Sequence, residues 1–287
     1  MNTIVLLHPG AMGASIGKAL TGAGHEVRWV GDGRSPATRE RASGAGLSEI
    51  ESLPNALEGA DVVLSVCPPS AADDVATAVG RLGFRGVYLD ANAVSPQTAR
   101  RIGENLTSCG AVFVDGGIVG PPATTAGSTR LYLSGGQAAT VAALFAGTVV
   151  DTAVVDDRPG SASAVKVCFA AWTKGTTALL LAIRTLAETE GVTSNLLSEW
   201  ATSIPELVER SERGSRSGLK AWRFAPEMDE IAAAFAAAGL PGGFHEAAAE
   251  IYLRLADLKD ADPPPTLPQV FDRLMAPAAH RDRSMRG

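Results

Sequence analysis

The chain has 287 residues, is 46% hydrophobic and carries a formal net charge of −6, with a pI of about 5.3. This length allows two domains, each with its own core. The acidic balance and the absence of a long basic stretch argue against a nucleic-acid-binding protein. The sequence shows neither a signal peptide nor a membrane-spanning run, so we expect a cytoplasmic protein that makes no membrane contact.

The three cysteines, Cys67, Cys109 and Cys168, are an odd number and are widely spaced in apolar surroundings. This pattern predicts reduced, buried thiols rather than a disulfide framework. No Cys/His cluster has the spacing of a metal site, so we expect no metal.

The first 30 residues read as strand, glycine turn, helix and strand. Thr3–Leu7 is β-branched and apolar, residues 8–13 break it, and small residues follow from Ala14 to Ala23. Such a context favours a dinucleotide-binding turn. Gly10 would let the backbone approach a pyrophosphate, and Gly13 would let the helix pack closely, with Ala11 and Met12 between them. His8 stands where the first glycine of G-x-G-x-x-G is expected, so we expect Pro9 to make the turn.

Up to about residue 155, strands alternate with helices, which predicts a doubly wound, mostly parallel Rossmann sheet. From Gly160 onward the pattern is helical, and Ser161 is a candidate cap for a helix running to Glu190. We therefore expect a Rossmann domain over 1–158, an all-α domain over 159–276 and a disordered tail over 277–287. The expected strands are Thr3–Leu7, Glu26–Val30, Asp61–Val66, Val87–Asp90, Ala111–Asp115, Arg130–Ser134 and Val149–Val155. The expected later helices are Leu196–Trp200, Ile204–Arg213, Pro226–Ala238, Phe244–Ala256 and Leu267–Met275.

Ligands of this fold bind at the carboxyl ends of the strands. Two strand ends carry candidate cofactor residues, Cys67 and Pro68 after one strand and Asn92 after another. Near the end of the second strand, Arg34, Ser35 and Thr38 form a candidate cradle for a 2′-phosphate. We therefore favour NADP (NADPH), and Asp32 keeps NAD possible.

Lys166 is the only charged residue between Pro159 and Thr173, on a helix otherwise rich in Ala, Val, Cys, Phe and Trp. A lysine there is costly unless it faces a cleft, and a partly desolvated ammonium near a helix N-terminus suits proton exchange. The alternative is a lysine that reaches along the surface into solvent.

The Gly10–Gly13 turn resembles the Gly-x-Met-Gly signature of the β-hydroxyacid dehydrogenase and 6-phosphogluconate dehydrogenase superfamily. Residues 115–122, 171–175 and 220–224 resemble a poorly characterised branch with its own C-terminal helical domain, and imine reductases share the architecture. The resemblance implies that Lys166 is the catalytic proton donor and acceptor. It also implies that Gly117, Val119, Gly120 and Ala170 occupy substrate-binding positions.

The chain departs from the superfamily at several of these positions. Ala170 replaces an asparagine, and Val119-Gly120-Pro121 replaces the Ser-Gly-Gly substrate loop. The later lysine of a Lys-Asp pair is missing around Glu227. A bulkier or less acidic substrate is therefore expected, with Thr173, Trp222 and Met228 as further candidate lining residues.

These observations favour an NADP-dependent oxidoreductase that interconverts a carbonyl and an alcohol of a small-molecule substrate. The first alternative is an imine reductase or reductive aminase, and the second is a non-catalytic dinucleotide-binding dimer. The long helix is apolar on more than one face, which predicts a homodimer through the helical domain.

Overall fold

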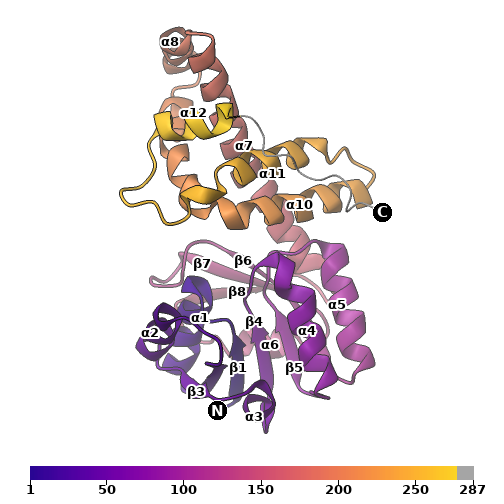
Figure 1. Cartoon of the computed structure of the whole chain (residues 1–287). Helices are drawn as coiled ribbons and strands as arrows, with labels where there is room; N and C mark the ends of the chain where they lie inside the picture. The colour runs from indigo at the N-terminus through magenta and orange to yellow at the C-terminus, as the bar shows by residue number, and fades with distance from the viewer. Residues whose placement is uncertain (277–287) are drawn as a thin grey trace. The chain divides into compact units, whose positions relative to one another are not determined.

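The computed structural model describes residues 1–276, and Figure 1 shows how their helices and strands are arranged within each part. The tail predicted over 277–287 lies outside the described residues. The chain divides into two compact units, Met1–Phe169 and a second unit from Ala170 onward. The division falls inside helix α7 (Ser161–Thr189) and not at residue 158. The first turns of α7 belong to the N-terminal unit because they pack against its sheet, as described below.

Within the described residues, eight strands form one sheet in the order β3-β2-β1-β4-β5-β6-β7-β8. All neighbouring strands are parallel except β6 and β7, so the expected mostly parallel sheet is confirmed. The sequence pattern did not predict β3, which has only three residues, and it predicted an end of β6 at Asp115, four residues short of the observed end. The strands are β1 (Thr3–Leu7), β2 (Glu26–Val30), β3 (Ser48–Ile50), β4 (Val62–Ser65), β5 (Val87–Asp90), β6 (Val112–Val119), β7 (Thr129–Ser134) and β8 (Val150–Val154).

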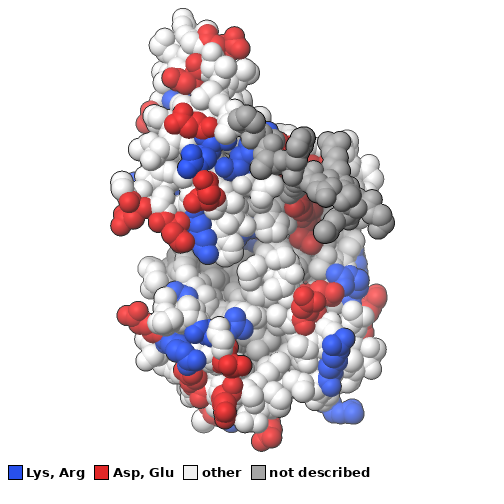
Figure 2. Space-filling model, in the orientation of Figure 1, with Lys and Arg blue, Asp and Glu red and all other residues white. Residues whose placement is uncertain are grey.

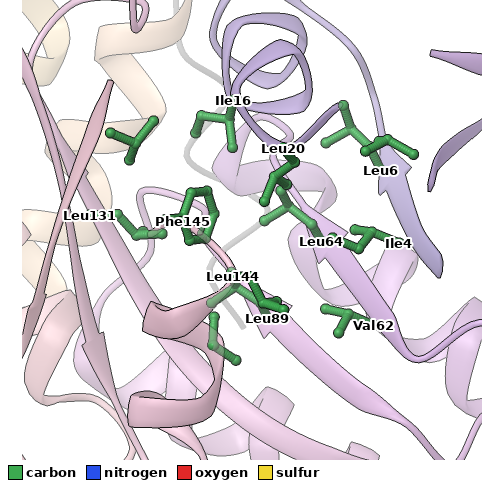
Figure 3. Close-up of a cluster of buried hydrophobic side chains, with 14 of the residues drawn as sticks. Ile4, Leu6, Ile16, Leu20, Val62, Leu64, Leu89, Leu131, Leu144 and Phe145 are labelled. Atoms are coloured by element: carbon green, nitrogen blue, oxygen red, sulfur yellow. The ribbon is translucent and has the colours of Figure 1, made fainter. Parts of the chain in front are cut away.

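The sheet is buried on both faces, which explains why its central strands are apolar without alternation. Ile4 and Leu6 of β1 face one cluster, which contains Ile16 and Leu20 from the first helix (Figure 3). Val5 and Leu7 face a second cluster on the opposite side. Helices α1, α2 and α6 contribute to the first cluster, and α3, α4 and α5 to the second. The six helices are α1 (Ala11–Gly22), α2 (Pro36–Gly44), α3 (Leu53–Leu57), α4 (Ala72–Arg81), α5 (Pro96–Ser108) and α6 (Ala138–Ala143).

Two of these helices begin with the same local signal. In α2 and α5, a Ser-Pro-x-Thr sequence places serine at the N-cap and proline in the first turn. The hydroxyl of Ser35 accepts a hydrogen bond from the Thr38 N–H at 3.3 Å, and the hydroxyl of Ser95 accepts one from the Thr98 N–H at 3.2 Å. A serine N-cap satisfies a backbone N–H that would otherwise have no partner. Proline in the first turn costs no helical hydrogen bond, because the N–H that it lacks would have no partner within the helix.

Within its described residues the second unit contains helices and no strand, as expected. Helix α10 begins at Ala221, so the predicted start at Pro226 is wrong and the proline lies inside the helix. Helices α10 and α11 run side by side (Figure 1), and the rings of Phe224 and Tyr252 join them at 5.3 Å between centroids. After α7, the helices are α8 (Thr193–Ser203), α9 (Glu206–Arg213), α10 (Ala221–Ala237), α11 (Gly243–Arg254) and α12 (Leu267–Met275).

All three cysteines are free, as predicted, but Cys67 is only half-buried and Cys109 and Cys168 are exposed. The apolar sequence around Cys168 misled the prediction, because α7 presents part of its apolar surface to solvent. Among residues 1–276, no helix is long and apolar enough to cross a membrane. The same residues contain no cluster of His, Cys, Asp and Glu that could hold a metal ion.

Candidate cofactor and catalytic site

Three neighbouring strands, β1, β4 and β5, end in register at one edge of the N-terminal sheet, and β6 continues past them to Val119. Leu7 of β1 pairs with Ser65 of β4, Ser65 with Asp90 of β5, and Asp90 with Asp115 of β6. The order of strands reverses between β1 and β4, which is the switch point where ligands of this architecture bind. The candidate cofactor residues therefore leave the sheet along one continuous edge.

The turn after β1 is made by His8 and Pro9 together. His8 adopts a φ of 65°, the left-handed conformation that the missing glycine would supply. The N–H of Gly10 donates to the carbonyl oxygen of His8 at 2.7 Å, which closes a three-residue turn around Pro9. Pro9 lies in the turn as expected, and the left-handed conformation of His8 is a contribution that the sequence did not predict.

The two glycines of this turn meet different demands. A Cβ at Gly13 would lie 2.7 Å from the carbonyl oxygen of His8, so the fold itself requires glycine there. A Cβ at Gly10 would meet nothing within 4 Å, and Gly10 has an ordinary φ of −67°. Nothing in the described residues requires glycine at position 10. A ligand that approaches the backbone closely would explain it.

The loop after β2 carries the predicted phosphate cradle. The hydroxyls of Ser35 and Thr38 are 3.1 Å apart, and Arg41 donates to the Thr38 hydroxyl at 2.9 Å. The Nε atom of Arg34 is buried without a hydrogen-bond partner. Arg39, in contrast, is engaged with Glu49 and with the carbonyl oxygen of Gly31. Figure 2 shows several basic side chains around the position of α2, mixed with acidic ones.

A groove of about 610 Å³ lies beside this loop, lined by Asp32, Arg39, Glu49, Glu51, Ser52 and Asn55. Its carboxylates outnumber its single cation, and that cation is already paired. Of the two arginines Arg34 and Arg39, Arg34 is therefore the better candidate for an anion.

Asn92 joins the ends of β4 and β5. Its side-chain oxygen accepts a hydrogen bond from the Cys67 N–H at 2.6 Å, and its side-chain nitrogen donates to the Ser65 hydroxyl at 3.0 Å. The Asn92 N–H donates to a carboxylate oxygen of Asp90 at 2.9 Å. The structure thus brings together Cys67 and Asn92, two of the predicted cofactor residues, through a buried network in which Asn92 is the central member.

Burial sets the protonation of the groups around Asn92. It raises the pKa of the Cys67 thiol to about 11, so this cysteine is protonated at neutral pH and is not a nucleophile. It also raises the pKa of Asp90 to about 7, with the nearby Asp115 adding to the effect. The second carboxylate oxygen of Asp90 is buried without a hydrogen-bond partner, which is consistent with the raised pKa.

The N-terminus of α7 is held by side chains of the sheet. One oxygen of Asp115 accepts hydrogen bonds from the backbone N–H groups of Gly160 and Ser163, at 3.0 and 2.9 Å. The other accepts one from the Ser163 hydroxyl at 2.5 Å. Ser134 of β7 accepts a bond from the Ala162 N–H at 3.0 Å and donates to Asp115. Ser161 was the cap expected from the sequence, which did not predict this role of Asp115 and Ser134.

This attachment places Lys166 beside the end of β6. A Cβ at Gly117 would lie 3.0 Å from the Cβ of Lys166 and 2.6 Å from the carbonyl oxygen of Ala162. Gly117 therefore lets α7 pack directly on the strand. Lys166 is half-buried. It lies beside Gly117, two residues after Asp115, which pairs with the last residue of β5.

The remaining predicted substrate residues divide between the two units. Val119 is half-buried and Gly120 is exposed, with a φ of 118° in the turn that returns toward Ser128. Ala170, Thr173, Trp222 and Met228 belong to the C-terminal unit, where Ala170 and Met228 are fully buried. Their contact with substrate stays a prediction.

The C-terminal unit contains a buried ion pair that the sequence did not reveal. Nζ of Lys174 lies 2.6 Å from a carboxylate oxygen of Glu227, and both side chains are largely buried. The Tyr252 hydroxyl donates to the Lys174 carbonyl oxygen at 2.8 Å, and the Lys174 ammonium lies 5.0 Å from the centroid of the Phe224 ring. The region around Glu227 lacks the lysine expected from the superfamily. Glu227 instead pairs with Lys174, which lies on a different helix.

Comparison with known families decides the nature of the N-terminal unit. Residues 4–146 match the family described as the NAD binding domain of 6-phosphogluconate dehydrogenase. The chain carries an NAD-binding domain of this type. Residues 187–255 match a domain of unknown function, DUF1932. Both matches confirm the resemblance drawn from the glycine turn and the C-terminal segments.

Individual relatives agree with this placement. The chain is 28% identical over 179 residues to a probable 3-hydroxyisobutyrate dehydrogenase of Mycobacterium tuberculosis, a match that spans 58% of each protein. A solved structure of 3-hydroxyisobutyrate dehydrogenase from Mycobacterium tuberculosis, with L-serine, covers 96% of this chain and all of its own at a TM-score of 0.70 and 22% identity. A reductive aminase from Aspergillus terreus, in complex with NADPH and ethyl levulinate, gives a TM-score of 0.57 and 18% identity over 96% of this chain and 99% of its own. These structural likenesses show the fold, which dehydrogenases and reductive aminases share.

Proposed function

We propose that this protein is an NADP-dependent oxidoreductase that interconverts a carbonyl and an alcohol, with Lys166 as the acid and base. The observation that carries the proposal is the position of Lys166, which packs against Gly117 at the sheet edge that carries the cofactor turn. A lysine held there by the Asp115 and Ser134 contacts belongs to a prearranged site.

The residues around the glycine turn fit a dinucleotide. Gly10 leaves open space beside its backbone, and the first N–H groups of α1 provide donors and a positive dipole end for a pyrophosphate. Arg34 has a buried nitrogen without a partner, as expected for a cation whose anion is a ligand. A nicotinamide cofactor bound here would supply or accept hydride. Lys166 would donate a proton from its ammonium to the substrate oxygen during reduction and take one back during oxidation.

The preference for NADP over NAD rests on Arg34. Its guanidinium can form paired, charge-assisted hydrogen bonds with a 2′-phosphate, and Ser35 and Thr38 add hydroxyls nearby. Asp32 argues for NAD, because an acidic residue after the second strand commonly binds the ribose 2′-hydroxyl. Asp32 is exposed and lines the acidic groove, whereas Arg34 is not among the residues that line this groove.

Reduction of an imine is the second candidate, and the structural likeness to a reductive aminase keeps it in view. Lys166 favours the carbonyl reaction, because an ammonium is a suitable proton donor to the oxygen that forms when hydride reaches a carbonyl. A non-catalytic dinucleotide-binding protein is the third candidate. The cost of placing Lys166 on an apolar helix argues against it, since binding alone does not require that charge.

A combined binding and turnover experiment tests the proposal. The purified protein should bind NADPH, and a mixed panel of ketones, aldehydes and imines should contain a substrate that drives NADPH oxidation. Gly10→Ala should fold normally, because its Cβ meets no protein atom, yet lose NADPH affinity. Gly22→Ala, which also enters open space but lies at the far end of α1, is the matched control and should bind normally. Unchanged NADPH affinity in Gly10→Ala would contradict the proposed cofactor site.

A further inference from the structure

His8 occupies a backbone position for which the fold favours glycine. Its φ of 65° lies in the left-handed region, where a side chain carries a conformational cost that glycine avoids. The Nδ1 atom of its ring is buried and makes no hydrogen bond within the described residues. The Nδ1 atom therefore has no protein partner that would account for an imidazole at this position.

The surroundings of His8 are arranged for an anion. Arg34, from the loop after β2, is close enough for its positive charge to act on His8, and its own Nε atom is buried and unpartnered. Cys67, which also feels the charge of Arg34, is a neutral thiol at this edge, and Asp90 lies behind it in the Asn92 network. Nδ1 of His8 and Nε of Arg34 thus both lack hydrogen-bond partners. They come from different loops and lie at the turn where the phosphates of a dinucleotide would bind.

We propose that the imidazole of His8 contacts a phosphate group of the bound dinucleotide together with Arg34, and that it takes up a proton from solvent as it does so. This inference rests on the proposed function only in requiring that the protein bind a dinucleotide. The phosphate supplies the negative charge that stabilises an imidazolium, and it offsets the repulsion from Arg34. His8 thereby becomes a binding residue at the position of the first glycine of the G-x-G-x-x-G motif.

The state of His8 in the free protein supports the proton step. Burial, with the charge of Arg34 as a second cause, lowers the pKa of His8 to about 4, so the ring is neutral at pH 6.5. An added phosphate acts in the opposite direction and raises this pKa. Dinucleotide affinity should therefore increase as the pH falls from 8 toward 6, and binding should consume protons.

Titration calorimetry with His8→Asn and His8→Gly tests the proposal, because both residues accept a positive φ and neither titrates. NADPH is titrated at pH 6.5 in two buffers of different ionisation enthalpy, which gives the number of protons taken up. Both variants should bind NADPH roughly 10-fold to 100-fold more weakly than the wild type, the range for a hydrogen bond to a charged group. Both should also take up fewer protons than the wild type, with the phosphate's own titration common to all three proteins.

Two fragments identify the phosphate that His8 contacts. 2′-AMP carries the 2′-phosphate without a pyrophosphate, and ADP carries the pyrophosphate without a 2′-phosphate. The fragment whose affinity and proton uptake depend on His8 names the group. Wild-type and variant proteins with equal NADPH affinity and equal proton uptake would overturn the inference while leaving the proposed function intact. A wild-type protein that binds neither NADPH nor NADH would overturn the proposed function itself.

Discussion

Gly117 of β6 and Lys166 of α7 pack so closely that a Cβ at Gly117 would lie 3.0 Å from the Cβ of Lys166. The same Cβ would lie 2.6 Å from the Ala162 carbonyl oxygen, a backbone atom that cannot move without the helix. The absence of a side chain at position 117 therefore sets how near Lys166 comes to the strand ends.

Gly117→Ala should push the first turns of α7 away from β6. We expect a loss of stability of about 1–3 kcal/mol, the usual cost of overpacking, and a clear fall in turnover with NADPH affinity retained. Denaturant unfolding and steady-state rates measure the two effects. Gly136→Ala, whose Cβ meets nothing within 4 Å, should leave both unchanged. Full activity in Gly117→Ala would show that the close packing does not position the lysine.

Arg34→Ala should weaken NADPH binding far more than NADH binding. The expected loss for NADPH is about 1.5–3 kcal/mol, because hydrogen bonds to a charged phosphate disappear while NADH has no 2′-phosphate to lose. Fluorescence titration with both cofactors measures the difference, and Arg81→Ala, an exposed arginine on α4, serves as the control. Equal losses for both cofactors, or a wild-type preference for NADH, would assign the selectivity to Asp32.

Asp90 should make the protein less stable as the pH rises. Its pKa is raised from 3.8 to about 7 by burial, so the folded state binds a proton more tightly than the unfolded chain. For such an acid, stability falls as the pH rises from about 4 to 7 and stays low above that range. Asp90→Asn, which is neutral at every pH, should gain roughly 2–3 kcal/mol more over the wild type at pH 8 than at pH 5. A difference in unfolding free energy that is the same at both pH values would contradict the shifted pKa.

We also expect a dimer built on α7. Trp172, Leu179 and Leu186 are seven residues apart on this helix and are 66%, 42% and 61% exposed. A repeated apolar stripe of this kind is suited to packing against a second copy. The wild type should sediment as a dimer of 29.5 kDa chains at micromolar concentration, and the double variant Leu179→Glu, Leu186→Glu as a monomer. Leu82→Glu, at an exposed position of the N-terminal unit, should remain dimeric, and a monomeric wild type would refute the expectation.

The sequence predicted the features that depend on local patterns. β1, β2, β5 and α12 have the bounds that the apolar runs and the helical pattern indicated. It did not predict contacts between distant segments, such as the Asp115 cap on α7 or the pairing of Lys174 with Glu227. The one sequence feature that could have indicated the role of Asp115 is a carboxylate that follows an apolar run and precedes two glycines. Pro226 also misled the prediction, because a proline within a helix is usually in the first turn and here lies further inside.

Lys166 is the residue on which the proposed reaction depends most, and Lys166→Met tests its role most directly. Methionine keeps the bulk of the side chain and removes the transferable proton, so folding and NADPH affinity should be retained. Turnover of a carbonyl substrate found in the panel should fall roughly 10²–10⁴-fold, the usual contribution of general acid–base catalysis. Lys18→Met, which changes an exposed lysine of α1, should keep wild-type turnover. Near-normal turnover by Lys166→Met would contradict the account and assign the proton to another group, with Lys174 or a water held by Thr173 next to be tested.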